Sequence, residues 1–221
     1  MIKNVILIAI SLTVLYFSIE DHGYMFISVP TFMMLSYYFC DLSLKIIYKY
    51  TITPKKDINI QSILFIGLVP IIFSFRDYDF TIEGYFLFWK LAFISILFSL
   101  ITILTLSQFY NFKNDKKLEN IIAINICFSL LIPAIGVMIN KNISYEKERK
   151  QLIEIYSKDI RNDRYGESYY INFKTNYNTD ESVDISKDFY NSITQNQIVL
   201  ITLSKGILGY DYIKKIKKAR E

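Results

Sequence analysis

The sequence has few of the residues from which metal centres, disulfide frameworks and cofactor sites are built. Its 221 residues include one histidine and two cysteines, Cys40 and Cys127, and both cysteines lie inside apolar runs. A thiol in such a run acts as a small apolar side chain. Neither CxxC nor HExxH spacing occurs. We therefore expect no disulfide framework, no zinc or other metal site and no cofactor.

Motifs for catalysis and phosphate binding are also missing. The chain contains no GxGxxG, no P-loop and no serine in GxSxG. His22 lies in a short loop with no second histidine and no nucleophile beside it, which favours a solvated side chain. No acid–base pair with a defensible geometry can be assigned, so we expect a protein that is not an enzyme.

Charge is scarce as well. Charged residues make up 21% of the chain and hydrophobic residues 52%, whereas a soluble domain of this length normally carries a larger charged fraction. The net charge of +4 could suggest nucleic acid. The basic residues, however, lie at the ends of hydrophobic runs and in the last residues, not interleaved with aromatic residues on one face. We therefore expect no nucleic-acid partner.

Five hydrophobic runs are candidates for membrane-spanning helices, which need about 20 predominantly apolar residues. Two of them contain Pro70 and Pro133, which membrane helices tolerate when neighbouring groups satisfy the freed carbonyl. The first run could be a signal peptide, but no small-residue cleavage site follows it and a second run begins at once. The five predicted spans are 2–19, 24–48, 58–75, 84–107 and 118–139.

Loop charges orient the predicted bundle. Lysines gather at Lys3, at 45–56 and at 113–117, whereas the connections 20–23 and 76–83 hold Asp and Glu. Because Lys and Arg stay on the cytoplasmic side, the N-terminus is predicted inside and the tail outside, in the periplasm or extracellular space. If the first run does not insert, the tail is cytoplasmic instead. The wealth of Ile, Asn, Lys, Tyr and Phe is typical of an AT-rich bacterial gene, so we expect a bacterial inner (plasma) membrane.

The chain turns polar after its last hydrophobic run. We predict an α-helical integral membrane bundle over 1–140 and a small α+β domain over 141–221. Residues 143–160 indicate a charged helix that continues the last span as a stalk. The other predicted elements of the tail include four strands, at 169–174, 182–185, 197–203 and 207–213. A short helix capped by Ser186 is predicted over 186–193, a turn over 204–206 and a basic end over 214–220.

Polar residues inside the runs are candidates for a functional site in the bundle, because an ionisable group in a span is costly. Asp41 is the main candidate. Lys45 lies four residues further on, shares its helix face and can pair with it. Gln61 and Asn125 are interpreted as hydrogen-bonding residues between helices. A polar path along these residues would make the chain a small transporter or channel subunit, although its few buried charges fit transport poorly.

The connection 76–83 is a candidate partner-binding segment on the outer side, although a solvated acidic loop is the simpler interpretation. Together with the Phe- and Leu-rich run behind it, the stretch 73–107 resembles a helix-loop-helix of the immunity proteins against pore-forming colicins. In that family an aromatic-Arg-acidic stretch with a following Thr and Gly also leads into such a span. The candidate binding residues are Arg76, Asp77, Tyr78, Asp79 and Glu83.

The resemblance implies a non-enzymatic, multi-pass inner-membrane protein that neutralises a membrane-active or periplasm-delivered toxin by occlusion. The chain departs from that family by an extra span and by its tail. Residues 183–210, with their Gly-Ile-Leu-Gly-Tyr end, are similar to a C-terminal module of uncharacterised bacterial membrane proteins, which implies no activity. The expected partners are thus the lipid bilayer and a protein toxin, and a membrane-anchored sensor or scaffold is a further alternative.

Overall fold

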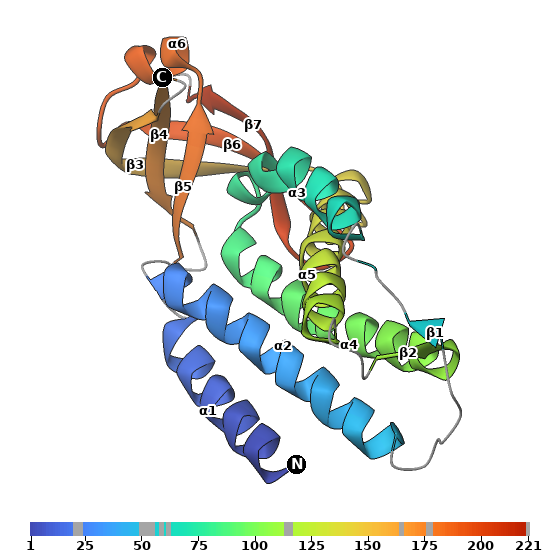
Figure 1. The fold of residues 1–221 in the computed structure, drawn as a ribbon. Helices are drawn as coiled ribbons and strands as arrows, with labels where there is room; N and C mark the ends of the chain where they lie inside the picture. Colours follow the sequence, from blue (N-terminus) through green and yellow to red (C-terminus); the bar gives the residue numbers. More distant parts are fainter. Residues whose placement is uncertain are drawn as a thin grey trace. The chain divides into compact units, whose positions relative to one another are not determined.

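The computed structural model describes residues 1–19, 24–48, 56–57, 60, 63–112, 117–163, 166–175 and 179–219. The described chain runs from helices into a β-sheet (Figure 1). Two short strands, β1 (Lys56–Asp57) and β2 (Tyr110–Asn111), pair in parallel between helices. The five long helices are α1 (Ile2–Ser18), α2 (Met25–Tyr48), α3 (Leu64–Asp79), α4 (Gly84–Phe109) and α5 (Lys117–Asn142).

Three of these helices are long and apolar enough to cross a membrane. They are Met25–Ile47 of α2, the whole of α4 and the whole of α5. The apolar helices Ile2–Ser18 and Leu64–Ser74 are shorter than the roughly 20 residues that a span needs. The described structure therefore contains three candidate spans, and the predicted number of five is not confirmed. Each of the five runs contains a helix, although the helix in the third run, α3, begins only at Leu64.

The chain divides into two compact units. The helical unit comprises Met1–Phe73 and Trp89–Ala134, and the sheet unit comprises Ser74–Phe88 and Ile135–Glu221. The sheet unit thus contains the polar tail together with the end of α3, the start of α4 and the end of α5. Through these helix ends the tail is continuous with α3 and with the candidate spans α4 and α5.

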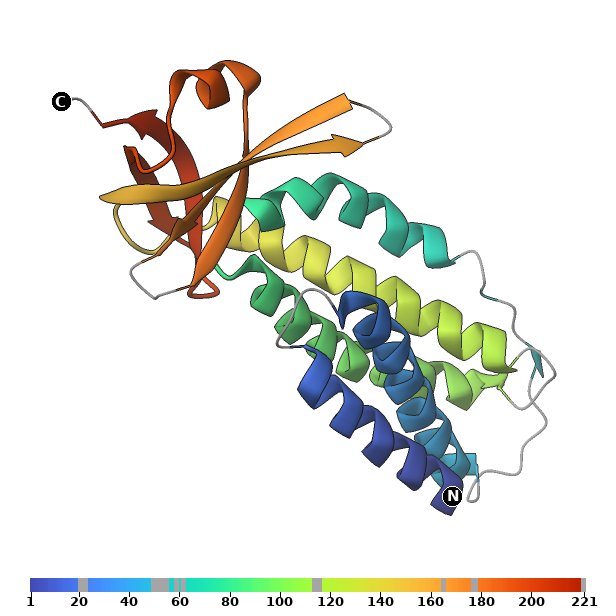
Figure 2. The ribbon, with the colours of Figure 1, turned by 90° about the vertical axis from the view of Figure 1, so that its left-hand side faces the viewer.

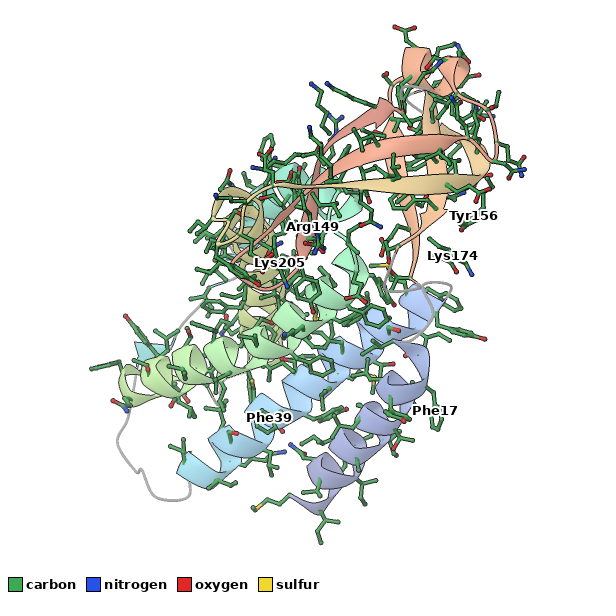
Figure 3. The ribbon with its side chains drawn as sticks, turned by 180° about the vertical axis from the view of Figure 1, so that it is seen from behind. Phe17, Phe39, Arg149, Tyr156, Lys174 and Lys205 are labelled. Carbon is green, nitrogen blue, oxygen red and sulfur yellow. The ribbon has the colours of Figure 1, made fainter. Side chains whose placement is uncertain are left out.

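The helical unit buries small and polar side chains between its helices, together with a hydrophobic cluster that includes Leu44, Ile103 and Phe112, and it exposes many other large apolar side chains. Ser11 and Ser18 of α1 are buried, whereas Phe17 is 71% exposed and projects away from its helix (Figure 3). A Cβ on Gly67 of α3 would lie 2.4 Å from the carbonyl oxygen of Cys127 in α5. Close approach at small residues is how membrane helices pack, and an apolar outer surface suits contact with lipid.

The tail forms a five-stranded antiparallel sheet in the order β5-β4-β3-β6-β7 (Figure 2). Its hydrophobic core joins residues from every strand with Ile82, which lies between α3 and α4. The elements are β3 (Arg149–Asp163), β4 (Gly166–Lys174), β5 (Asp180–Ile185), α6 (Lys187–Ser192), β6 (Ile198–Lys205) and β7 (Asp211–Lys218).

The predicted stalk helix over 143–160 is wrong, because most of this stretch is the long strand β3. Ile153 and Ile155 are 5% and 0% exposed, whereas Leu152, just before them, is 61% exposed and Glu154, between them, is exposed. Such alternation is the period of a strand. Pairing with β4 on one side and β6 on the other gives the backbone of β3 its partners, which a solvated stalk would lack.

The end of the chain also differs from the prediction. The strand predicted over 207–213 begins only at Asp211, residues 206–210 form the turn, and the predicted basic end is strand as far as Lys218. Lysines are common on edge strands, where they discourage further pairing. The predictions of β4, β5 and β6 are confirmed. Ser186 caps α6 as predicted, since its Oγ accepts a hydrogen bond from the Phe189 amide at 3.3 Å.

Candidate functional site at the connection between α3 and α4

The segment predicted as a loop over 76–83 is partly helical. Helix α3 continues through Asp79, and α4 begins at Gly84. A tight turn joins the two helices: the Gly84 amide donates to the Thr81 carbonyl at 2.9 Å, and Glu83 has a φ of +56°. A Cβ on Gly84 would lie 2.3 Å from the Tyr78 carbonyl oxygen, so only glycine fits there.

This connection adds a short extended segment to the free edge of β7. The Ile82 amide donates to the Asp211 carbonyl at 2.8 Å, and the Ile213 amide donates to the Phe80 carbonyl at 2.8 Å. Thr81 and Tyr212 form an antiparallel bridge between them. The side chain of Ile82, 4% exposed, enters the core of the sheet. The segment is thus part of the sheet unit and not a free loop.

The same connection also bonds to β5, the strand at the other edge of the sheet. The backbone amide of Glu83 donates to Oε1 of Glu181 at 2.9 Å. Burial raises the pKa of the Glu181 carboxyl, against the lowering effect of this hydrogen bond. The few residues between α3 and α4 therefore contact both edge strands and tie them to the helices.

Asp77 forms a second tie within the sheet unit. Its Oδ1 lies 2.7 Å from Nζ of Lys141 near the end of α5. The same Nζ lies 5.5 Å from the ring centre of Tyr212 in β7, a cation–π geometry. The Asp77 side chain is 14% exposed, so this ion pair is better shielded from solvent than a surface pair.

Of the five residues predicted to bind a partner, Arg76 and Asp79 are exposed. The Arg76 guanidinium lies 5.6 Å from the centre of the Phe80 ring. Tyr78 is half-buried edge-to-face against Phe88, with ring centres 5.7 Å apart, and burial raises its pKa. Asp77 and Glu83 are engaged inside the unit. Partner binding by these residues stays a prediction, with Arg76 and Asp79 as its accessible part.

Sequence reasoning missed Asn140, which fixes the turn between β6 and β7 to the end of α5. Its Nδ2 donates to the Tyr210 carbonyl at 3.1 Å, and its Oδ1 accepts from the Leu208 amide at 3.2 Å. A Cβ on Gly206 would lie 2.1 Å from the Asn140 carbonyl oxygen. The only signals in the sequence are an asparagine at the end of an apolar run and the glycines of the turn.

The second candidate group lies in the helical unit around Asp41, which is 4% exposed. The predicted pair with Lys45 is present, with Nζ 2.6 Å from the carboxylate. Two further partners were not predicted: Lys117 of α5 forms an ion pair with it, and Asn4 of α1 donates to it at 2.8 Å. The carboxylate thus holds three helices together, which accounts for a buried charge without a transported ligand.

Asn125 connects α2 and α5. Its Oδ1 accepts a hydrogen bond from Ser36, and its Nδ2 donates to the carbonyl of Ile121 at 2.9 Å. This is the interhelical role predicted from the sequence. Gln61, the remaining polar candidate, lies outside the described residues.

The sheet unit carries a surface cavity of about 460 Å³, formed at β4, β5 and α6. Two of its charged residues have partners: the Tyr169 hydroxyl donates to Glu167, and Lys187 lies 3.6 Å from the same carboxylate. Among the described residues no group of three His, Cys, Asp or Glu could hold a metal ion. Comparison with protein-family models, curated proteins and solved structures finds no match to this chain.

Proposed function

We propose that the protein is a non-enzymatic binding protein of the bacterial inner membrane that neutralises a membrane-active or periplasm-delivered toxin, as an immunity protein does. The observation that carries the proposal is the incorporation of residues 80–83 into the sheet unit. A binding surface on that unit is held by the ends of α3, α4 and α5. It stays at the membrane surface, where a toxin enters the bilayer.

The charge pattern supports a sheet unit on the outer side. The start of α4 and the end of α5 belong to the same unit, as two antiparallel spans require. The opposite ends of α4 and α5 adjoin the lysine-rich stretch 113–117, which favours the cytoplasm. This argument uses α4 and α5 and does not depend on α1. Reporter fusions after residue 221 test the side directly.

Occlusion is the proposed mechanism. The toxin's inserting segment contacts the apolar helices, while Arg76 and Asp79 on the exposed end of α3 select the cognate toxin. Opposite charges at an interface chiefly provide specificity and faster association. Both residues lie beside the sheet surface, because the segment that follows them pairs with β7.

Survival of cells that express the protein and are challenged with a panel of membrane-active bacterial toxins tests the proposal. We expect the double variant Arg76→Ala, Asp79→Ala to lose protection at unchanged protein level. The matched control is Lys174→Ala, Asp180→Ala, which removes an exposed ion pair of 3.9 Å from the same unit and should protect as the parent does. Full protection by the first variant would exclude Arg76 and Asp79 from recognition. No protection by the parent protein would exclude the function.

A further inference from the structure

Three large apolar side chains are exposed immediately beyond the end of α5. Ile143, Tyr145 and Ile207 are 49%, 56% and 51% exposed. Ile143 and Tyr145 follow the helix in the sequence, whereas Ile207 belongs to the turn between β6 and β7. We call these three residues the apolar cluster. Exposed apolar groups gathered in one place mark an interaction surface.

Backbone hydrogen bonds hold the cluster in place. The Ile207 amide donates to the Ile143 carbonyl at 2.8 Å, and the Tyr145 amide donates to the Lys205 carbonyl at 3.3 Å. Ser144 and Gly206 form an antiparallel bridge between these contacts. The side chains are therefore displayed together by a fixed backbone and are not brought together by chance in a loose loop.

The cluster continues an exposed apolar side of α5. Ile135, Met138 and Ile139 are 43%, 43% and 38% exposed on that helix, and their spacing of three and four residues places them on one face. Ile143 follows Ile139 by four residues, and its amide still donates to the Ile139 carbonyl at 2.9 Å. Ile207, bonded to Ile143, extends this apolar stripe from the helix into the sheet unit.

We propose that the apolar cluster enters the interfacial region of the bilayer, so that the turn 206–209 fastens the sheet unit to lipid. A tyrosine beside two isoleucines suits the boundary between headgroups and acyl chains. The ammonium of Lys205, 5.9 Å from the Tyr145 ring centre, forms a pair with Glu146 at 3.7 Å and can stay at headgroup level. The proposal requires that α5 spans the membrane, and it holds for either side of the sheet unit.

Fluorescent labelling in lipid nanodiscs tests the proposal. The cysteine added by Ile207→Cys carries an environment-sensitive dye, and quenching by nitroxide lipids is compared with quenching by aqueous iodide. The control is Ile160→Cys, which is 50% exposed on β3 and lies roughly 35 Å along the strand from Arg149 at about 3.3 Å per residue. Cys40 and Cys127 are buried, so the unsubstituted parent measures background labelling.

We expect the dye at 207 to be quenched several-fold more by nitroxide lipid than the dye at 160, and several-fold less by iodide. Equal iodide quenching at the two sites would overturn the proposal. Protection of site 207 from both quenchers would also overturn it, because a protein surface would then cover the cluster. If Ile207→Cys folds poorly, Ile143→Cys must give the same pattern, and a result like that at 160 would refute the proposal.

Discussion

Replacing Ile82 by alanine tests whether the connection between α3 and α4 belongs to the core of the sheet unit. The side chain is 4% exposed and lies in one cluster with Ile153, Ile201 and Ile213. The backbone bonds between residues 80–82 and β7 do not involve this side chain. The substitution therefore removes packing and leaves the pairing possible.

Truncation of a buried isoleucine to alanine costs about 2–5 kcal/mol, because apolar contact is lost and a cavity remains. For a unit of this size, each kcal/mol lowers the melting temperature by about 4–8 °C. The expected decrease is thus at least about 8 °C. Ile160→Ala makes the same change at a 50% exposed position, where we expect at most about 1 kcal/mol from the lower strand preference of alanine.

Proteolysis during heating in detergent is a suitable assay. Because β7 is rich in lysine, trypsin cuts the sheet unit as soon as it unfolds, and mass spectrometry locates the cuts. The measured quantity is the temperature at which cleavage within residues 149–218 begins. If Ile82→Ala and Ile160→Ala lower this temperature equally, the connection does not contribute to the core.

Three further substitutions probe other contacts by the same heating assay. Gly206→Ala should lower the melting temperature of the sheet unit, because the added Cβ would collide with α5 backbone; an unchanged value would contradict that close contact. Since burial raises the pKa of Glu181, its carboxyl stabilises the fold least at high pH. Glu181→Gln should therefore raise the melting temperature near about pH 8 and have no effect below about pH 4; a gain that persists in acid would exclude this cause. Asn4→Ala removes a 2.8 Å hydrogen bond to Asp41 and should cost the helical unit about 1.5–3 kcal/mol, whereas Thr13→Ala, which affects only a bond to its own helix, should cost little; for this pair the measured quantity is the temperature at which cleavage within residues 1–73 begins.

The strands that could be predicted are those with a clear local alternation. In β4, Ile171 and Phe173 are buried, as their spacing of two indicates. The apolar residues of β3 lie so close together that they fit one face of a helix as well as a strand. Pairing with β4 and β6 decides between the two, and these partners come later in the chain.

The same distinction applies to the candidate sites. The pair of Asp41 with Lys45 could be predicted because the two residues are one helical turn apart. Its contacts with Asn4 and Lys117 join distant parts of the chain. Residues 80–82 pair with β7 through backbone amide and carbonyl groups. Because every residue except proline carries both groups, no residue type in the sequence predicts this pairing.

The participation of Asp77 and its neighbours in the sheet unit has a consequence for biosynthesis. Asp77 and Tyr212, which contact each other, are 135 residues apart. At about 5–20 residues per second, a ribosome needs about 7–27 s to make the chain between them. During that time α4 and α5 leave the ribosome, while residues 80–82 have no strand to pair with. The last strand to be made, β7, therefore completes a pairing with residues 80–82, which were made before half of the chain had been synthesised.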